Sequence, residues 1–225
     1  VYFLYGAEHL KLNNSYFDIP VVYNKQTKKW IKYFTGRGRK LFTRYSARAG
    51  RYAPVLSKIL DDMGLPRDLI YLAMAESGFH NSAKSWAKAV GPWQFMPRTG
   101  KTFGLKQNWY VDERRDPIKA TKAAGTYLSK LYNMMGSWEL AMASYNAGEG
   151  KMKRAIRRYR TRSFWKIIRG RYLKSETKNY VPKIMALAII GKNLNSFGFK
   201  DTIDYKEHLD FDEVVVHADT DLFKV

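Results

Sequence analysis

Apolar side chains recur at helical spacing over most of the middle of the chain. This periodicity predicts helices over residues 49–63, 66–77, 117–136, 138–146 and 176–194, with shorter basic helices through residue 158 and over 163–168. Asp116 and Ser137 suit N-caps, Pro117 suits a first helical turn, and glycines follow several of the predicted helices. Pro54 is expected as an early break or a first-turn residue of the helix over 49–63, and Pro182 as a break or kink near the start of the last helix.

The remaining segments lack a long period. Residues 79–115 are rich in Gly, Ser, Asn, Pro and Trp, and we expect an irregular path there with short helical turns and one small hairpin. Residues 1–47 are aromatic, basic and irregular in pattern. The organisation predicted is therefore a wrapping segment over 1–47, a main domain over 48–198, and an acidic appendage or start of a further module over 199–225, with a strand at 214–216.

Composition narrows the class of protein. An apolar fraction of 45% allows a sizeable core, and 40 basic against 20 acidic residues give a net charge of +20, which favours anionic partners. The absence of cysteine excludes disulfides and thiolate metal sites, and no apolar run is long enough for a transmembrane helix. The four histidines show no ligand spacing, so neither a metal nor an organic cofactor is expected.

Glu76 is the candidate acid. It follows Leu69, Leu72 and Ala73 on one helical face, and Gly78 predicts the end of that helix. Partial burial and the negative end of the helix dipole both disfavour the carboxylate, so we expect a raised pKa, as a general acid requires. On these residues alone, the alternative is a glutamate at a helix end that pairs with one of the many bases.

Three further segments have both a structural and a functional interpretation. The loop over 91–99 offers the Gln94 amide and the apolar Met96 for sugar recognition, or it is a packed structural loop. Tyr145 and Asn146 end a predicted helix, where they either face a pocket or serve packing and capping. In the same way, 176–182 is either an ordinary helix start or a place for Tyr180 on a cleft wall with Glu176 as a buried organiser.

Together, and in this order, these segments resemble the lytic transglycosylase domain of glycoside hydrolase family 23. The resemblance covers roughly residues 16–198. The matching positions are Glu76 and Ser77; Gly91, Gln94, Met96, Pro97 and Thr99; Ala141, Ala143, Tyr145, Asn146, Ala147 and Gly148; and Glu176, Thr177, Tyr180 and Val181. It implies an α+β, mainly α, lysozyme-like fold with an extended basic N-terminal segment.

The resemblance also implies an activity, cleavage of the β-1,4 bond between N-acetylmuramic acid and N-acetylglucosamine in peptidoglycan, with 1,6-anhydro-muramic ends. Glu76 would be the catalytic acid and then base. Binding roles are expected for Ser77, Gln94, Met96, Tyr145, Asn146 and Tyr180, and a supporting role for Glu176. Alternatives are lysozyme-like hydrolysis of the same or a deacetylated glycan, and an inactive peptidoglycan-binding protein.

The resemblance implies peptidoglycan strands as partners, and the basic charge would attract the anionic polymers of the wall. A nucleic-acid binder is disfavoured, since no spacing in the basic segment 151–174 matches a nucleic-acid motif. The resemblance implies a monomer exported to the bacterial periplasm or cell envelope. Association with a membrane or the wall would use a removed N-terminus or a missing C-terminal module, and no anchor is visible in the sequence.

Overall fold

The computed structural model describes residues 16–200 and Leu209, and its elements are almost all helical. Their bounds are α1 Lys25–Thr35, α2 Arg39–Asp62, η2 Arg67–Leu69, α3 Ile70–Ser77, α4 Pro97–Thr102, η3 Glu113–Arg115, α5 Pro117–Met135, α6 Trp138–Ala147, α7 Glu149–Tyr159, α8 Phe164–Ile167, α9 Ser175–Lys192 and η4 Asn195–Phe197. In this described part, β-structure is limited to isolated antiparallel bridges within 84–112.

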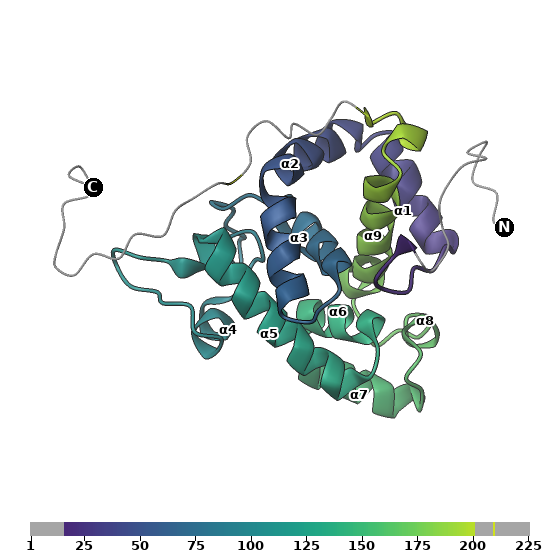
Figure 1. Ribbon diagram of the computed structural model, residues 1–225. Helices are drawn as coiled ribbons and strands as arrows, with labels where there is room; N and C mark the ends of the chain where they lie inside the picture. The colour runs from purple at the N-terminus through teal and green to yellow at the C-terminus, as the bar shows by residue number, and fades with distance from the viewer. Residues whose placement is uncertain (1–15, 201–208, 210–225) are drawn as a thin grey trace, which may run out of the picture.

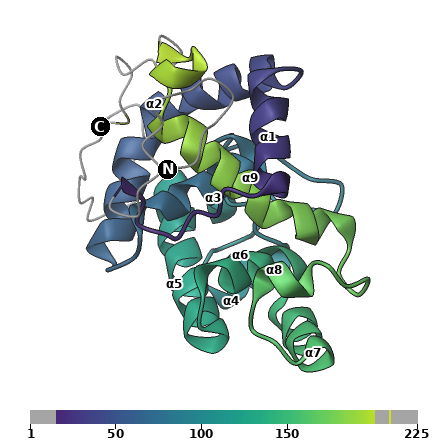
Figure 2. The ribbon, with the colours of Figure 1, turned by 90° about the vertical axis from the view of Figure 1, so that its right-hand side faces the viewer.

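Helix α9 is the centre of the fold. Its residues from Ile184 to Ile190 are all buried, because α1, α3 and α6 pack against different sides of it (Figure 1). A helix that is apolar around its whole circumference is expected only in such an interior position. Helices α5 and α6 pack together beside it, and α7 lies at the end of the molecule opposite the start of α2 (Figure 2).

Several helix boundaries follow the local signals in the sequence. The Asp116 side chain accepts hydrogen bonds from the backbone N–H groups of Ile118 and Lys119, with Pro117 in the first turn of α5. Ser137 caps α6 in the same way through the N–H of Leu140. The predicted starts of these two helices are confirmed.

The expectation of an irregular path over residues 1–47 is wrong for 25–47. Asn24 caps α1 through the N–H groups of Gln26 and Thr27, and Thr27, Ile31 and Phe34 are buried at helical spacing. Helix α2 begins at Arg39, ten residues before the predicted helix. It runs without interruption across residues 47 and 48, so the secondary structure has no break at the boundary predicted there.

Pro54 is neither the break nor the first-turn residue predicted, since α2 begins at Arg39 and continues on both sides of this proline. Phe42, Ser46, Gly50, Leu56 and Leu60 form one buried stripe along α2, and their packing outweighs a proline penalty of about 3 kcal/mol. Helix α9 likewise continues through Pro182.

At the other end of the domain, Phe199 is fully buried and its ring lies 4.5 Å from that of Phe42. This first residue of the predicted appendage therefore belongs to the core. Positions 201–208 and 210–225, with the predicted acidic appendage and the strand at 214–216, lie outside the described residues.

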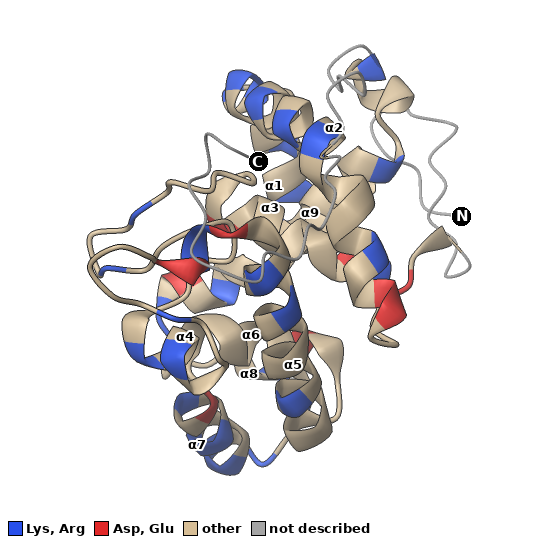
Figure 3. Cartoon of the chain, turned by 60° about the vertical axis from the view of Figure 1, so that its left-hand side comes forward, with Lys and Arg blue, Asp and Glu red and all other residues tan. Residues whose placement is uncertain are grey.

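In the described part of the chain, no helix has both the length and the apolar character needed to cross a membrane. Lysine and arginine recur along the helices, as α4, α5 and α7 show in Figure 3.

Candidate active site

Glu76 lies in the last turn of α3, which ends at Gly78 as predicted. The next side chain, Ser77, donates a hydrogen bond to the backbone oxygen of Pro92 at 2.9 Å and accepts one from the N–H of His80 at 3.0 Å. Ser77 therefore fixes the end of α3 to the loop over 91–99. Its side chain serves this connection and is not among the cleft-lining residues.

Helix α9 brings three polar side chains to the end of α3. Glu176, Tyr180 and Lys183 are spaced at i, i+4 and i+7, so they share one helical face. The Tyr180 hydroxyl donates a hydrogen bond to Oε1 of Glu76, and Lys183 Nζ donates to the backbone oxygen of Ala75 at 2.6 Å. The acid is thus held between two helices that are far apart in the sequence.

Helix α6 joins the same group through Asn146. Its side-chain nitrogen donates to Oε1 of Glu176 at 3.0 Å, and its side-chain oxygen accepts from the Thr177 hydroxyl at 2.9 Å. These two contacts fix the orientation of the amide and join α6 to the first turn of α9. The Glu176 carboxylate is thus hydrogen-bonded to a second site residue, but the residue is exposed, so the prediction that Glu176 is a buried organiser is wrong about its burial.

These side chains border a cleft of about 690 Å³. Its walls come from α1, α3, α6 and α9. The lining residues are Lys29, Trp30, Tyr33, Ala75, Glu76, Asn146, Ser175, Glu176, Asn179, Tyr180 and Lys183. Four of the eight predicted site residues, Glu76, Asn146, Glu176 and Tyr180, therefore face one cavity.

The environment of Glu76 shifts its protonation. The pKa of Glu76 is raised from 4.5 to about 7, and the largest cause is the removal of the carboxyl from water. The hydrogen bond from Tyr180 and the positive charge of Lys183 lower this pKa, while the negative charge of Glu176 raises it. The net result is a carboxyl that exchanges its proton near neutral pH, as acid and base catalysis require.

Tyr145 lies close to this group but supports the loop over 91–99. Its hydroxyl donates to the backbone oxygen of Trp93 at 2.8 Å, and its ring packs against those of Phe95 and Tyr127. Burial, followed by the charge of Glu76, raises the pKa of Tyr145 well above its ordinary value, so this hydroxyl stays protonated. Its observed partners are those of a residue that holds the loop next to the acid.

Gln94 and Met96 occupy the loop rather than the cleft lining. Gln94 has a positive φ of 50°, and its side-chain nitrogen donates to the backbone oxygens of Gly91 and Ala83 at 2.8 and 3.3 Å. Met96 is 44% exposed at the start of α4. The structure thus leaves Met96 accessible to a ligand and uses the Gln94 amide nitrogen within the loop.

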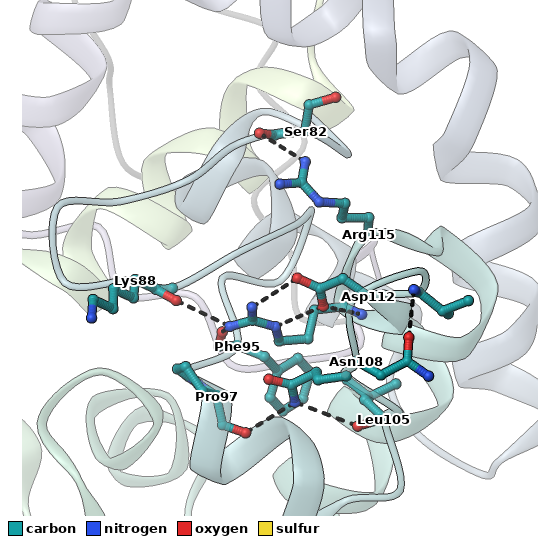
Figure 4. A network of polar contacts seen from close by, with 12 residues as sticks. Ser82, Lys88, Phe95, Pro97, Leu105, Asn108, Asp112 and Arg115 are labelled. Atoms are coloured by element: carbon teal, nitrogen blue, oxygen red, sulfur yellow. Dashed lines mark hydrogen bonds and ion pairs between the residues drawn. The ribbon is translucent and has the colours of Figure 1, made fainter.

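A buried arginine holds this loop in place. The Arg114 guanidinium donates to both carboxylate oxygens of Asp112 at 2.8 Å, and to the backbone oxygens of Lys88 and Phe95 at 3.0 and 3.1 Å (Figure 4). The loop also passes close to the backbone of Arg114 at Gly91, whose φ is +85°. A Cβ there would lie 1.7 Å from the Arg114 carbonyl oxygen, so only glycine fits.

Sequence reasoning missed the basic and aromatic parts of the cleft. Lys183 could have been predicted from helical spacing, because it lies at i+3 from Tyr180 and i+7 from Glu176 and so shares their helical face. Lys29, Trp30 and Tyr33 had no such signal, since they reach the site only through the packing of α1 on α9. In the described residues, no group of three or more His, Asp or Glu side chains is arranged to hold a metal ion.

Comparison with known proteins shows the family to which this chain belongs. Residues 56–168, half of the chain, match the family described as Transglycosylase SLT domain. The chain belongs to the transglycosylase SLT domain family. Membrane-bound lytic murein transglycosylase D of Escherichia coli K12 is 38% identical over 158 residues, which are 68% of this chain and 34% of that protein. The family resemblance that the motifs predicted is confirmed.

A second relative matches a shorter part of the chain. A putative tributyltin chloride resistance protein of Alteromonas sp. strain M-1 is 36% identical over 112 residues, 49% of this chain and 54% of that protein. The chain thus spans about a third of the length of the first relative and about half of the second.

Two solved structures have the same fold. An inactive Glu-to-Gln mutant of lytic transglycosylase Slt from Pseudomonas aeruginosa has a TM-score of 0.52 and 26% identity, over 68% of this chain and 26% of that one. The soluble lytic transglycosylase Slt70 of Escherichia coli has a TM-score of 0.52 and 19% identity, over 72% and 29% respectively. The predicted mainly helical, lysozyme-like fold is confirmed.

Proposed function

We propose that this chain cleaves the β-1,4 bond between N-acetylmuramic acid and N-acetylglucosamine in peptidoglycan and leaves 1,6-anhydro-muramic ends. One observation carries the proposal: Glu76, with a pKa of about 7, is held by Tyr180 at the wall of a cleft of about 690 Å³. The names of its relatives support it, since two are lytic transglycosylases and a third is named a murein transglycosylase.

The chemistry needs only one carboxyl if the substrate supplies the nucleophile. Protonated Glu76 gives its proton to the glycosidic oxygen, and the bond to C1 of the muramic residue breaks. The resulting carboxylate then takes the proton of the C6 hydroxyl of the same sugar. That oxygen forms a new bond to C1, so the 1,6-anhydro ring closes without water and Glu76 is protonated again.

The remaining predicted residues have positioning and binding roles in this proposal. Tyr180 orients the acid, while Asn146 and Glu176 line the same cleft and are hydrogen-bonded to each other. Ser77, Gln94 and Tyr145 hold the loop over 91–99 beside the cleft, and Met96 is available for an apolar contact with the glycan. The partner is the peptidoglycan strand, which would place the chain at the cell envelope.

Hydrolysis is the second candidate, and one observation favours it. Glu176 lines the same cleft as Glu76, and glycosidases that use water need a second carboxyl as nucleophile or base. In the transglycosylase mechanism Glu176 only supports the site. The two candidates therefore differ in the expected product and in the expected effect of replacing Glu176.

Product analysis on purified peptidoglycan tests both. Mass spectrometry of the parent digest is expected to show anhydro-muramic ends, which are lighter than the hydrolysis product by one water. Glu76→Gln is expected to lower the rate about 10²- to 10⁴-fold. Glu176→Gln should lose less, with Glu149→Gln, which lies outside the cleft, as the matched control.

Reducing muramic ends together with an equally severe loss in Glu176→Gln would establish the hydrolase. If the parent binds peptidoglycan and releases no product of either kind, the chain is a binding protein and the catalytic proposal fails.

A further inference from the structure

Helix α1 supplies a wall of the cleft that the family match does not include. Lys29, Trp30 and Tyr33 line the same cavity as Glu76, whereas the SLT match begins at residue 56. The position of α1 is fixed by its buried residues Ile31 and Phe34 and by its packing on α9. This wall is therefore a rigid part of the site that belongs to this chain's own N-terminal region.

The charge of this wall is entirely positive. Helix α1 contains four lysines and no acidic residue, and of these lysines only Lys29 lines the cleft. Lys29 is exposed, and among the described residues no acidic side chain lies within ion-pair distance of it. Lys183, which lines the same cleft from α9, instead lies in the field of Glu76 and Glu176.

An aromatic pair stands beside this lysine. Tyr33 is 40% exposed, and its ring meets that of Trp30 edge-on at 5.5 Å. Trp30 in turn stacks on the fully buried Phe34 at 5.8 Å. The pair is therefore anchored in the core and offers a fixed apolar surface next to a cation.

We propose that this wall binds a carboxylate of the peptide stem on the glycan strand, with Lys29 as the cation and Tyr33 with Trp30 as apolar support. The inference rests on the proposed function, because peptide stems are the acidic groups attached to the muramic residue next to the bond that Glu76 cleaves. A carboxylate complements Lys29, and the short apolar side chains of a stem complement the ring pair.

The test uses the 225-residue chain and glycan strands of one length distribution, in which the stem carboxylates are either free or converted to amides, because hydrolytic removal of the stems would leave a lactyl carboxylate on each muramic residue. The ratio of kcat/KM for the two substrates is the readout. We expect a preference of about three- to fivefold for strands with free stem carboxylates, the size of one exposed charge pair. Lys29→Ala should bring the ratio to about one, Lys29→Arg should retain it, and Lys25→Ala, on α1 but outside the cleft lining, should leave it as in the parent.

A binding measurement separates this inference from the proposed function. In a Glu76→Gln background, retention of both kinds of strand is compared with and without Lys29→Ala. A stem preference that depends on Lys29 supports the inference even if the parent cleaves nothing. An equal affinity for both strands, or an equal loss in Lys25→Ala, would overturn it.

Discussion

The hydroxyl of Tyr180 on α9 donates a hydrogen bond to Oε1 of Glu76 at the end of α3, across 104 positions of the sequence. The tyrosine is almost completely buried, so the bond is shielded from water. A donor of this kind favours the carboxylate and keeps the pKa of Glu76 from rising further. It also fixes the direction in which the acid points.

Tyr180→Phe is expected to lower kcat and to move the alkaline limb of the pH–rate profile to higher pH. The substitution removes the hydrogen bond from the Tyr180 hydroxyl to the charged carboxylate. Such a bond contributes about 1.5–3 kcal/mol, so the rate should fall about 10- to 100-fold. Tyr132→Phe, on α5 and outside the cleft, is the control. An unchanged limb with a lower rate would assign Tyr180 to substrate binding alone.

Lys183→Met should also raise the pKa of Glu76, because it removes a positive charge that lowers it. The protonated acid would then persist to higher pH, and the alkaline limb should move upward. Lys183→Arg keeps the charge and should keep the limb in place. The profile is measured as kcat/KM on both sides of neutral pH, with urea denaturation to verify folding. Equal profiles for Met and Arg would contradict the charge effect.

Glu76 should also make the fold less stable at high pH. Its folded pKa is about 7 against an ordinary value of 4.5, so its stabilising contribution is fully present below about pH 4.5 and is lost as the pH rises through about 7. Full ionisation costs on the order of 3 kcal/mol, and less where water screens the half-buried side chain.

Glu76→Gln is therefore expected to be more stable than the parent by about 1–3 kcal/mol at about pH 8, and similar to it at about pH 4.5. Denaturation in urea at the two pH values measures the difference. A stability gain of the same size at both would show that ionisation of Glu76 is not its cause.

Gly91→Ala should destabilise the chain more than Gly104→Ala. Both glycines have a φ of +85°, so each substitution carries a backbone penalty of about 1–2 kcal/mol. Only at Gly91 would the new methyl group meet another backbone, 1.7 Å from the Arg114 oxygen, whereas nothing lies within 4 Å at Gly104. We expect the free energy of unfolding, measured in urea, to fall by about 1–3 kcal/mol more for Gly91→Ala than for Gly104→Ala. Equal losses would mean that the loop adjusts freely.

The predictable parts of the fold are those set by short-range contacts. Asp116 and Ser137 cap helices through side-chain hydrogen bonds that reach only two or three residues, so their positions in the sequence predict the helix starts. The path of residues 25–47 was not predictable in this way. Phe34 and Phe42 make it helical and buried only because α9 and Phe199 provide surfaces to pack against.

The candidate site likewise contains residues that sequence motifs predict and residues that only helix packing brings to the cleft. Glu76, Asn146, Glu176 and Tyr180 could be named from the motifs that carry them, and they meet at one cleft. The motifs also included Ser77, Gln94 and Tyr145, whose observed hydrogen bonds hold a loop, since a motif does not separate residues that border a cavity from residues that support it. Lys29 entered the site only through helix packing.

The sequence by itself determined the family, the helix caps and the choice of Glu76 as the candidate acid, because each depends on residue types at short, fixed spacings. Only the tertiary structure decided that Glu76 has a pKa of about 7, since that value results from burial, Tyr180, Lys183 and Glu176 acting together. It also decided that α1 forms a wall of the cleft. Both depend on distances between segments separated by many residues, which packing sets and local sequence patterns do not encode.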